Sequence, residues 1–168
     1  MLDICSQFDK PYDPNPLKDI AAEQQKGRTY RIVPADNGTG SDIDAVIKGT
    51  TQSANDFLKV ARQADALYSH VDSNGRLLFN DNLRQPSYYL YYLNKSLLHL
   101  CKAYQMKEDV VSRNKLLNQS ITDLKNAEKS LKHTQHGCFA QWYAGDRIFG
   151  FEGLYKLLNS LTENEKPV

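Results

Sequence analysis

A long run of apolar residues at helical spacing is the feature that most constrains this fold. Between residues 43 and 71, apolar side chains recur at intervals of three and four residues. This pattern predicts one amphipathic helix of about eight turns. Ser41 is a good N-cap for the helix, and the turn-forming residues 72–75 are predicted to end it.

Two further long helices and a shorter one are predicted after it. Residues 76–106 form a helical region that contains Pro86, where we expect a break or kink because proline lacks a backbone donor. A third helix is predicted from near Asp109 to residues 136–137, and a last one over roughly residues 151–161. Short connections favour antiparallel neighbours. The predicted fold class is therefore all-α, an antiparallel helical bundle of three long helices plus a shorter fourth.

The first 41 residues differ from the rest. They hold four of the six prolines, which punctuate regular structure. Residues 17–26 are compatible with a short helix, and residues 28–33 with an edge strand or extended linker. We therefore predict an extended or irregular N-terminal segment over residues 1–41 and a helical bundle domain over residues 42–168.

Charge and hydropathy narrow the classes of partner. The formal net charge is +1, so the chain as a whole has no general electrostatic attraction for nucleic acid. No apolar run approaches the roughly 20 residues that a membrane helix needs, and the first residues lack the pattern of a signal peptide. We expect a soluble chain that, taken alone, is cytoplasmic.

His133, His136 and Cys138 come closest to a metal constellation. Two histidines three residues apart can share a helix face, and a nearby cysteine could add sulfur. A fourth ligand is missing from the local pattern, so the favoured alternative is a helix end whose histidines meet the last carbonyl groups. We predict no metal and no cofactor. Two of the three cysteines, Cys5, Cys101 and Cys138, lie in helical or near-helical apolar surroundings and are predicted to be reduced and buried, although a single disulfide stays open.

Three carboxylates raise the question of glycoside hydrolysis. That reaction usually needs two carboxyl groups facing each other across a cleft. Asp81, Asp146 and Glu152 flank predicted turns and helix ends, where salt bridging or capping explains them more simply. No signature of nucleophilic catalysis or of a phosphate-binding loop accompanies them. We predict no catalytic residue and no enzyme acting alone.

Two aromatic clusters are the candidate contact surfaces. Tyr88, Tyr89, Tyr91 and Tyr92 crowd into five positions of one helix, so they point in several directions. Core packing is favoured for most of them, and an exposed patch at a protein interface is the alternative. Five aromatic residues lie between residues 139 and 151. A structural plug at one end of the bundle is favoured there, and a sugar stacking on Trp142 is the alternative. The candidate ligand or partner contacts are Trp142, Tyr143, Asp146, Arg147, Tyr88 and Tyr91.

Two stretches carry a family resemblance. They are residues 76–83 (RLLFNDNL), followed by the tyrosine-rich helix, and residues 136–146 (HGCFAQWYAGD), followed by the last helix. Together they resemble the helical accessory region near the C-terminus of large bacterial glycoside hydrolases of the α-glucuronidase-like family 115. The sequence departs from that pattern at Pro86 and at Cys138, where a basic residue is expected. No catalytic residue carries over to the matching positions.

The resemblance implies a non-catalytic accessory or interaction module of a carbohydrate-active enzyme. Its partners would be the catalytic or neighbouring domains of that enzyme, with carbohydrate as a further candidate ligand, and it would be exported if the enzyme is secreted. The alternative is an independent helical-bundle protein that mediates protein–protein association or self-association as a homodimer. Neither reading includes nucleic acid or a membrane span.

Overall fold

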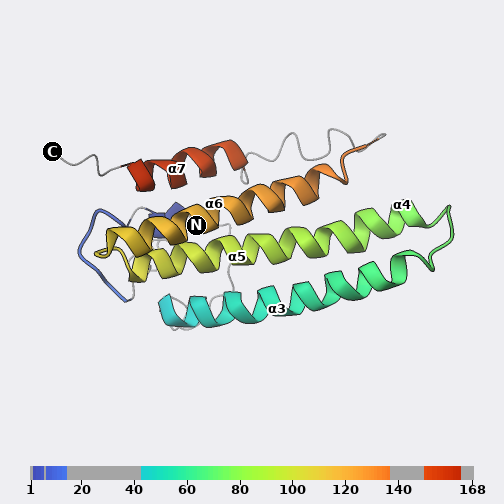
Figure 1. Ribbon diagram of the computed structural model, residues 1–168, viewed down its shortest axis with the longest axis horizontal. Coiled ribbons are helices and arrows are strands. Elements are labelled where there is room, and N and C mark those ends of the chain that lie inside the picture. The colour runs from blue at the N-terminus through green and yellow to red at the C-terminus, as the bar shows by residue number, and fades with distance from the viewer. Residues whose placement is uncertain (1, 6, 15–42, 137–149, 164–168) are drawn as a thin grey trace, which may run out of the picture.

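A computed structural model of the chain describes residues 2–5, 7–14, 43–136 and 150–163. Every regular element among these residues is helical, so the predicted all-α class is confirmed. The principal helices are α3 (Ile43–Tyr68), α5 (Gln85–Gln105), α6 (Val110–Lys132) and the shorter α7 (Phe151–Glu163). Shorter elements are α1 (Leu2–Cys5), α4 (Arg76–Phe79) and the π-helix η1 (Asn80–Arg84). The four principal helices lie side by side in the order α3, α5, α6, α7 (Figure 1).

Helix α5 is at the centre of this arrangement. It packs against α3 on one side and α6 on the other, while α7 packs against α6. Small side chains permit the close approach of α3, which buries Thr50, Ala54, Ala61 and Ala64. Between α5 and α6, the hydroxyl groups of Ser96 and Ser120 are fully buried, and each donates to the other's backbone carbonyl, at 2.9 and 2.8 Å. These reciprocal bonds satisfy polar groups that would otherwise be costly inside the core.

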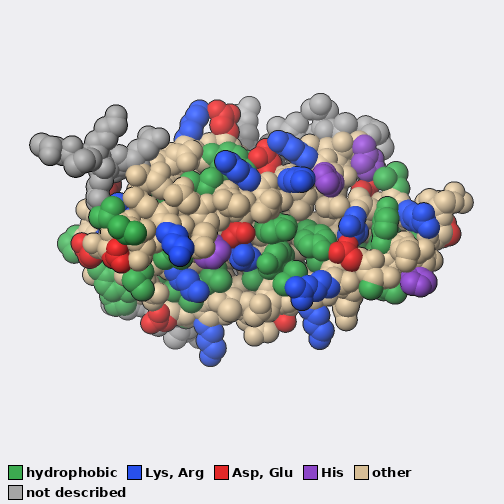
Figure 2. Space-filling model, viewed as in Figure 1, with side chains coloured by type: hydrophobic (Ala, Val, Ile, Leu, Met, Phe, Trp, Pro, Cys, Tyr) green, Lys and Arg blue, Asp and Glu red, His purple; other side chains and the backbone are tan. Residues whose placement is uncertain are grey.

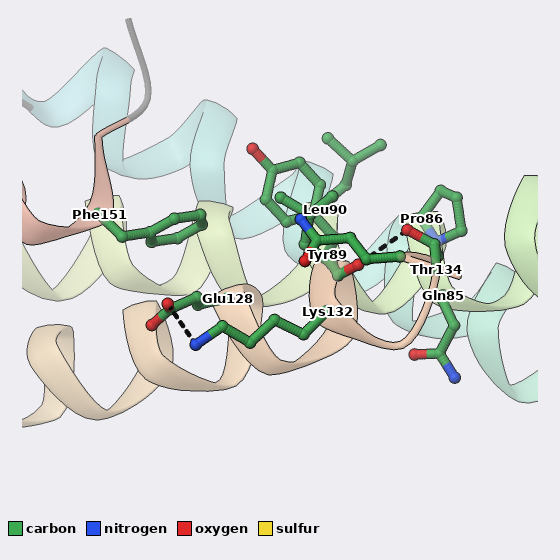
Figure 3. Close-up of a pocket in the computed structure, with 10 residues that line it drawn as sticks. Gln85, Pro86, Tyr89, Leu90, Glu128, Lys132, Thr134 and Phe151 are labelled. Atoms are coloured by element: carbon green, nitrogen blue, oxygen red, sulfur yellow. Dashed lines mark hydrogen bonds and ion pairs between the residues drawn. The ribbon is translucent and has the colours of Figure 1, made fainter. Parts of the chain in front are cut away.

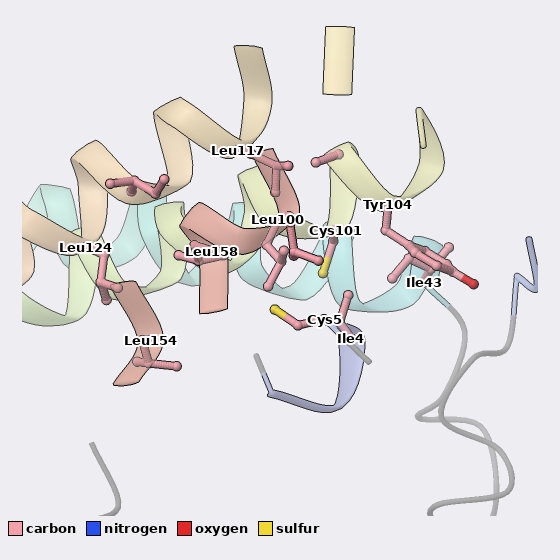
Figure 4. Packing of buried hydrophobic residues seen from close by; sticks show 13 residues of the cluster. Ile4, Cys5, Ile43, Leu100, Cys101, Tyr104, Leu117, Leu124, Leu154 and Leu158 are labelled. Atoms are coloured by element: carbon pink, nitrogen blue, oxygen red, sulfur yellow. The ribbon is translucent and has the colours of Figure 1, made fainter. Parts of the chain in front are cut away.

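The hydrophobic core gathers at the end of the molecule where α5 stops and α6 starts. Leu100, Cys101 and Tyr104 of α5 are fully buried there, against Leu117 and Leu124 of α6. Figure 4 shows side chains from α7 and from the N-terminal residues converging on the same cluster. These contributions come from Leu154, Leu158 and Leu161 of α7 and from Ile4 and Cys5.

The N-terminal residues 4–5 and 7–14 complete this end of the core, a role that the sequence did not reveal. The hydroxyl of Tyr104 donates to the backbone oxygen of Asp13 and accepts from its N–H, both at 3.1 Å. The buried ammonium of Lys107 donates to the backbone oxygens of Gln7, Phe8 and Lys10. The predicted helix at 17–26, the predicted strand at 28–33 and the predicted cap Ser41 lie outside the described residues.

Pro86 does not break the helix that contains it. The five residues of η1 form a π-helical turn directly before α5, in which the N–H of Gln85 bonds to the oxygen of Asn80. Pro86 then falls in the first turn of α5, where a missing N–H is tolerated. The expected interruption therefore takes the form of a wider turn, and the chain stays helical from Arg76 to Gln105.

The other predicted helix ends hold with small shifts. Asp109 caps α6, because its carboxylate accepts from the N–H of Ser112 at 3.2 Å. Helix α6 stops at Lys132, earlier than the predicted 136–137, and the hydroxyl of Thr134 donates to the carbonyl of Leu131 there. Helix α3 ends at Tyr68, and Asp72 then accepts two backbone N–H bonds in the predicted turn. Within the described ranges, none of the helices combines the length and apolarity needed to cross a membrane.

Candidate functional site

The structure describes two of the six candidate contact residues. Tyr88 and Tyr91 lie in the N-terminal half of α5. Trp142, Tyr143, Asp146 and Arg147 lie outside the described residues, as does the aromatic cluster around them except for Phe151. The candidate site is therefore built around the tyrosines of α5.

Tyr88, Tyr91 and Tyr92 form a continuous aromatic surface, which we call the tyrosine face. The rings of Tyr88 and Tyr92 stack with their centroids 6.2 Å apart, and those of Tyr91 and Tyr92 lie 4.8 Å apart. All three side chains are half-buried, and so is Tyr89, which instead lines a cavity between α5, α6 and α7. Core burial was expected for most of the four, and none is fully buried. The reason is that only part of the circumference of α5 is covered at this end.

A charged network fixes one edge of the tyrosine face. Asp65 of α3 accepts hydrogen bonds from the hydroxyl of Tyr88 and from the guanidinium of Arg84. Arg84 also lies over the ring of Tyr68, 5.0 Å from its centroid. The hydrogen bond to Asp65 and partial burial together raise the pKa of Tyr88. Partial burial acts to raise the pKa of Asp65, but the bonds from Tyr88 and Arg84 outweigh it, and this pKa is lowered.

A buried carboxylate anchors the other edge. Asp123 of α6 has only 8% of its side chain exposed, and it lies 2.8 Å from Nδ1 of His99 and 3.6 Å from the ammonium of Lys95. Lys95 also lies 5.8 Å from the ring centroid of Tyr91. Burial, the neighbouring Tyr91 and the carboxylate of Asp123 raise the pKa of Tyr92. Both carboxylates at the edges of the face are thus matched by basic groups, Arg84 of η1 for Asp65 and Lys95 and His99 of α5 for Asp123.

The hydroxyl groups of Tyr91 and Tyr92 differ from that of Tyr88. They form no hydrogen bond within the described part of the chain, although their rings are packed. A tyrosine with a packed ring and an available hydroxyl is suited to a surface that is apolar and polar at once. In Figure 2, hydrophobic side chains lie in the middle of the visible face, over α5, with both basic and acidic side chains around them.

The histidines near the end of α6 do not assemble a metal centre in the described residues. His133 is exposed, and Nε2 of His136 lies 2.8 Å from Oδ2 of Asp81, although the two atoms are not aligned for a hydrogen bond. Cys138 lies outside the described residues. The described ranges contain no group of three or more histidine, cysteine, aspartate or glutamate side chains that could hold a metal ion.

The candidate carboxylates of a hydrolase have other neighbours. Asp81 contacts His136, and Glu152 forms an ion pair with Lys156 one turn later on α7, at 2.7 Å. Asp146 lies outside the described residues. The pairing of Glu152 agrees with the predicted salt bridging of these acids.

The two described cysteines are free and buried. Burial raises the pKa of Cys5 to about 11 and that of Cys101 to about 12, so both thiols are protonated at neutral pH. They serve as small core residues.

A cavity of about 400 Å³ lies on the other side of α5 from the tyrosine face. Figure 3 shows Tyr89 and Leu90 of α5 between Phe151 and Pro86, with the ion pair of Lys132 and Glu128 beneath. Glu128 also accepts a hydrogen bond from the hydroxyl of Tyr155 at 2.7 Å. Both carboxylate oxygens are therefore engaged within the protein, and the cavity offers mainly apolar walls.

Comparison with known proteins adds no relative. No family model, curated protein or solved structure matches this chain. The resemblance to the family 115 accessory region stays a prediction.

Sequence reasoning missed several members of the site. Along η1 and α5, the spacing of positions 84, 88, 92, 95 and 99 by three and four residues was a usable signal that they share one helix face. Asp65 and Asp123 come from other helices, and no local pattern connects them to the tyrosines.

Proposed function

We propose that this chain is a non-catalytic helical interaction module that binds the surface of another folded protein through its tyrosine face. The observation that carries the proposal is the pair Tyr91 and Tyr92, whose half-buried rings are packed while their hydroxyl groups lack partners in the described residues. Tyrosine is enriched at protein interfaces because its ring supplies apolar area and its hydroxyl supplies a directed bond.

The surroundings of the two tyrosines support this role. Asp65 holds Tyr88 and Arg84 in place, and Asp123 holds His99 and Lys95. Side chains that are already ordered lose little conformational entropy on binding, so the free energy of association is larger for the same contacts. A central aromatic patch with charged groups at its edges is the usual composition of a protein interface.

Two kinds of partner fit the proposal. The resemblance of residues 76–83 and 136–146 to an accessory region of glycoside hydrolases favours a neighbouring catalytic domain. The alternative is an independent bundle that associates with another protein or with itself. Carbohydrate binding through Trp142 stays a separate candidate, which rests on residues outside the described part of the chain.

Site-specific photo-crosslinking tests the proposal. A photoreactive phenylalanine analogue replaces Tyr91 in the full-length protein made in its native cell, and Gln63, an exposed residue of α3, is the matched control position. We expect a discrete protein adduct from position 91 and none from position 63. Equal adducts at both positions, or none at position 91, would contradict the proposal.

A further inference from the structure

The outward-facing residues of α5 are arranged symmetrically about one point of the helix. Tyr91 and Tyr92 flank that point. Tyr88 and Lys95 lie equally far from it on either side, and so do Arg84, directly before α5, and His99. When two copies of a helix pack antiparallel about a two-fold axis, residues equally far from the axis meet each other.

The chemistry of the inner matched pair, Tyr88 and Lys95, is complementary. Lys95 of one copy would meet the ring of Tyr88 in the other, and an ammonium over a tyrosine ring is attractive. Lys95 is already seated at ring level, 5.8 Å from the centroid of Tyr91. The hydroxyl of Tyr88 bonds to the carboxylate of Asp65, which adds negative charge where the second lysine would arrive.

The two ends of the face carry charges that are already paired within one copy. One end carries Arg84 with Asp65, and the other carries His99 with Asp123. In the antiparallel arrangement these two ends meet as internally paired groups. In a parallel arrangement, Lys95 would instead meet Lys95, which is repulsive.

We infer that the occupant of the tyrosine face is a second copy of this chain, docked with α5 antiparallel to α5 and with the two-fold axis between Tyr91 and Tyr92. This inference rests on the proposed function and names the partner of the same surface. The hydroxyl groups of Tyr91 and Tyr92 then hydrogen-bond across the axis, which gives them the partners that they lack within one copy. The matched positions run from Arg84 to His99, about 22 Å at the helical rise of 1.5 Å per residue.

Thiol crosslinking at two positions of α5 tests the register. Tyr91→Cys and, separately, Lys102→Cys are made in the full-length protein with Cys138→Ser, and each is treated with a short bismaleimide. Cys5 and Cys101 are buried and do not compete. Near the axis, two thiols introduced at position 91 face each other, whereas thiols introduced at position 102 lie roughly 30 Å apart, given the helical rise. We expect crosslinked dimer from position 91 and none from position 102.

Light scattering over a range of concentrations measures the association itself. We expect the mass of the unmodified protein to approach that of two chains, and Lys95→Gln to weaken the association at least tenfold, while Lys59→Gln on α3 leaves it unchanged. Circular dichroism melts show whether each variant is folded. Crosslinking at both positions, or at position 102 alone, would overturn the antiparallel register.

A mass of one chain at every concentration would overturn the second copy as the occupant. The photo-crosslinking experiment at position 91 then separates the two proposals. An adduct with a different protein leaves the interaction module in place and removes only the self-association.

Discussion

The two halves of α5 belong to the same helix but have opposite environments. In the C-terminal half, Ser96, Leu100, Cys101, Ala103 and Tyr104 are each 0% exposed. In the N-terminal half, the six consecutive large side chains from residue 88 to residue 93 are all half-buried. Four of the five tyrosines of α5 lie in the N-terminal half, but both halves carry leucines, and the difference in burial follows from which segments cover each half.

The covering comes from segments distant in sequence. At the C-terminal half, α7, residues 4–5 and residues 7–13 close over the helix, and Tyr104 contacts the rings of Phe8 and Tyr12. At the N-terminal half, α3 and α6 flank the helix and leave the tyrosine face between them. The comparison shows a molecule that closes its core at one end and presents aromatic side chains at the other.

The largest expected effect is on stability. Leu100→Ala removes a fully buried side chain and should lower the free energy of unfolding by about 2–5 kcal/mol. Leu90→Ala changes a half-buried residue that lines a cavity and should cost less than half as much. Urea denaturation of both variants measures the difference. Equal losses would show that the two halves are equally packed.

Thiol reactivity gives a second contrast along the same helix. Cys101 is buried, and its pKa is raised to about 12, so at pH 8 it should react with a thiol reagent only when the protein opens. A thiol introduced by Tyr91→Cys in dilute protein should react at least roughly 100-fold faster. Stopped-flow absorbance resolves the two rates. Similar rates would mean that the reagent reaches Cys101 as easily as it reaches position 91, which would contradict the contrast between the two halves.

Three Tyr→Phe substitutions on α5 should rank by the hydrogen bonds that they remove. Tyr104→Phe loses two bonds to the backbone of Asp13 and should cost about 1–2 kcal/mol. Tyr88→Phe loses one partly exposed bond to Asp65 and should cost less. Tyr91→Phe loses none within the described residues and should stay within about 0.5 kcal/mol. Thermal denaturation checks the order, and a costly Tyr91→Phe in dilute protein would contradict it.

The smallest expected effect is the pH dependence at the edge of the tyrosine face. The pKa of Asp65 is lowered from its ordinary value of 3.8, so its stabilising contribution is complete above that value and is lost as the pH falls through the folded-state pKa. Because 37% of this side chain is exposed, the contribution should be below about 1 kcal/mol. The free energy of unfolding should fall less between pH 6 and pH 3 for Asp65→Asn than for the unmodified chain. The same loss in both would remove this role for Asp65.

The sequence predicted the helices better than their surroundings. Apolar spacing located α3, α6 and α7 because each buries one stripe, and Asp109 marked the start of α6. Pro86 was expected to interrupt the helix, but the π-helical turn that accommodates it depends on backbone geometry that composition does not encode. The partners of the tyrosines, Asp65 and Asp123, became visible only when three helices were brought together.

The role of the N-terminal residues was also beyond the sequence. Pro11 and Pro14 indicate irregular backbone, and residues 7–14 contain only turns, bends and irregular backbone. Nothing in that pattern shows that Ile4 and Cys5 enter the core or that Asp13 bonds to Tyr104. Such contacts join residues about 90 positions apart, and local spacing carries no information about them.

Hydroxyl-radical footprinting of α5 tests the central contrast most directly. Oxidation of Tyr91, Tyr92 and Tyr104 is followed by mass spectrometry in dilute protein and at increasing concentration. We predict that Tyr104 stays unmodified throughout, because it is fully buried, and that Tyr91 and Tyr92 are oxidised in dilute protein and become protected as association proceeds. Oxidation of Tyr104 at a rate similar to that of Tyr91 would contradict the account. So would oxidation of the tyrosine face that stays unchanged both at high concentration and in native cell extract.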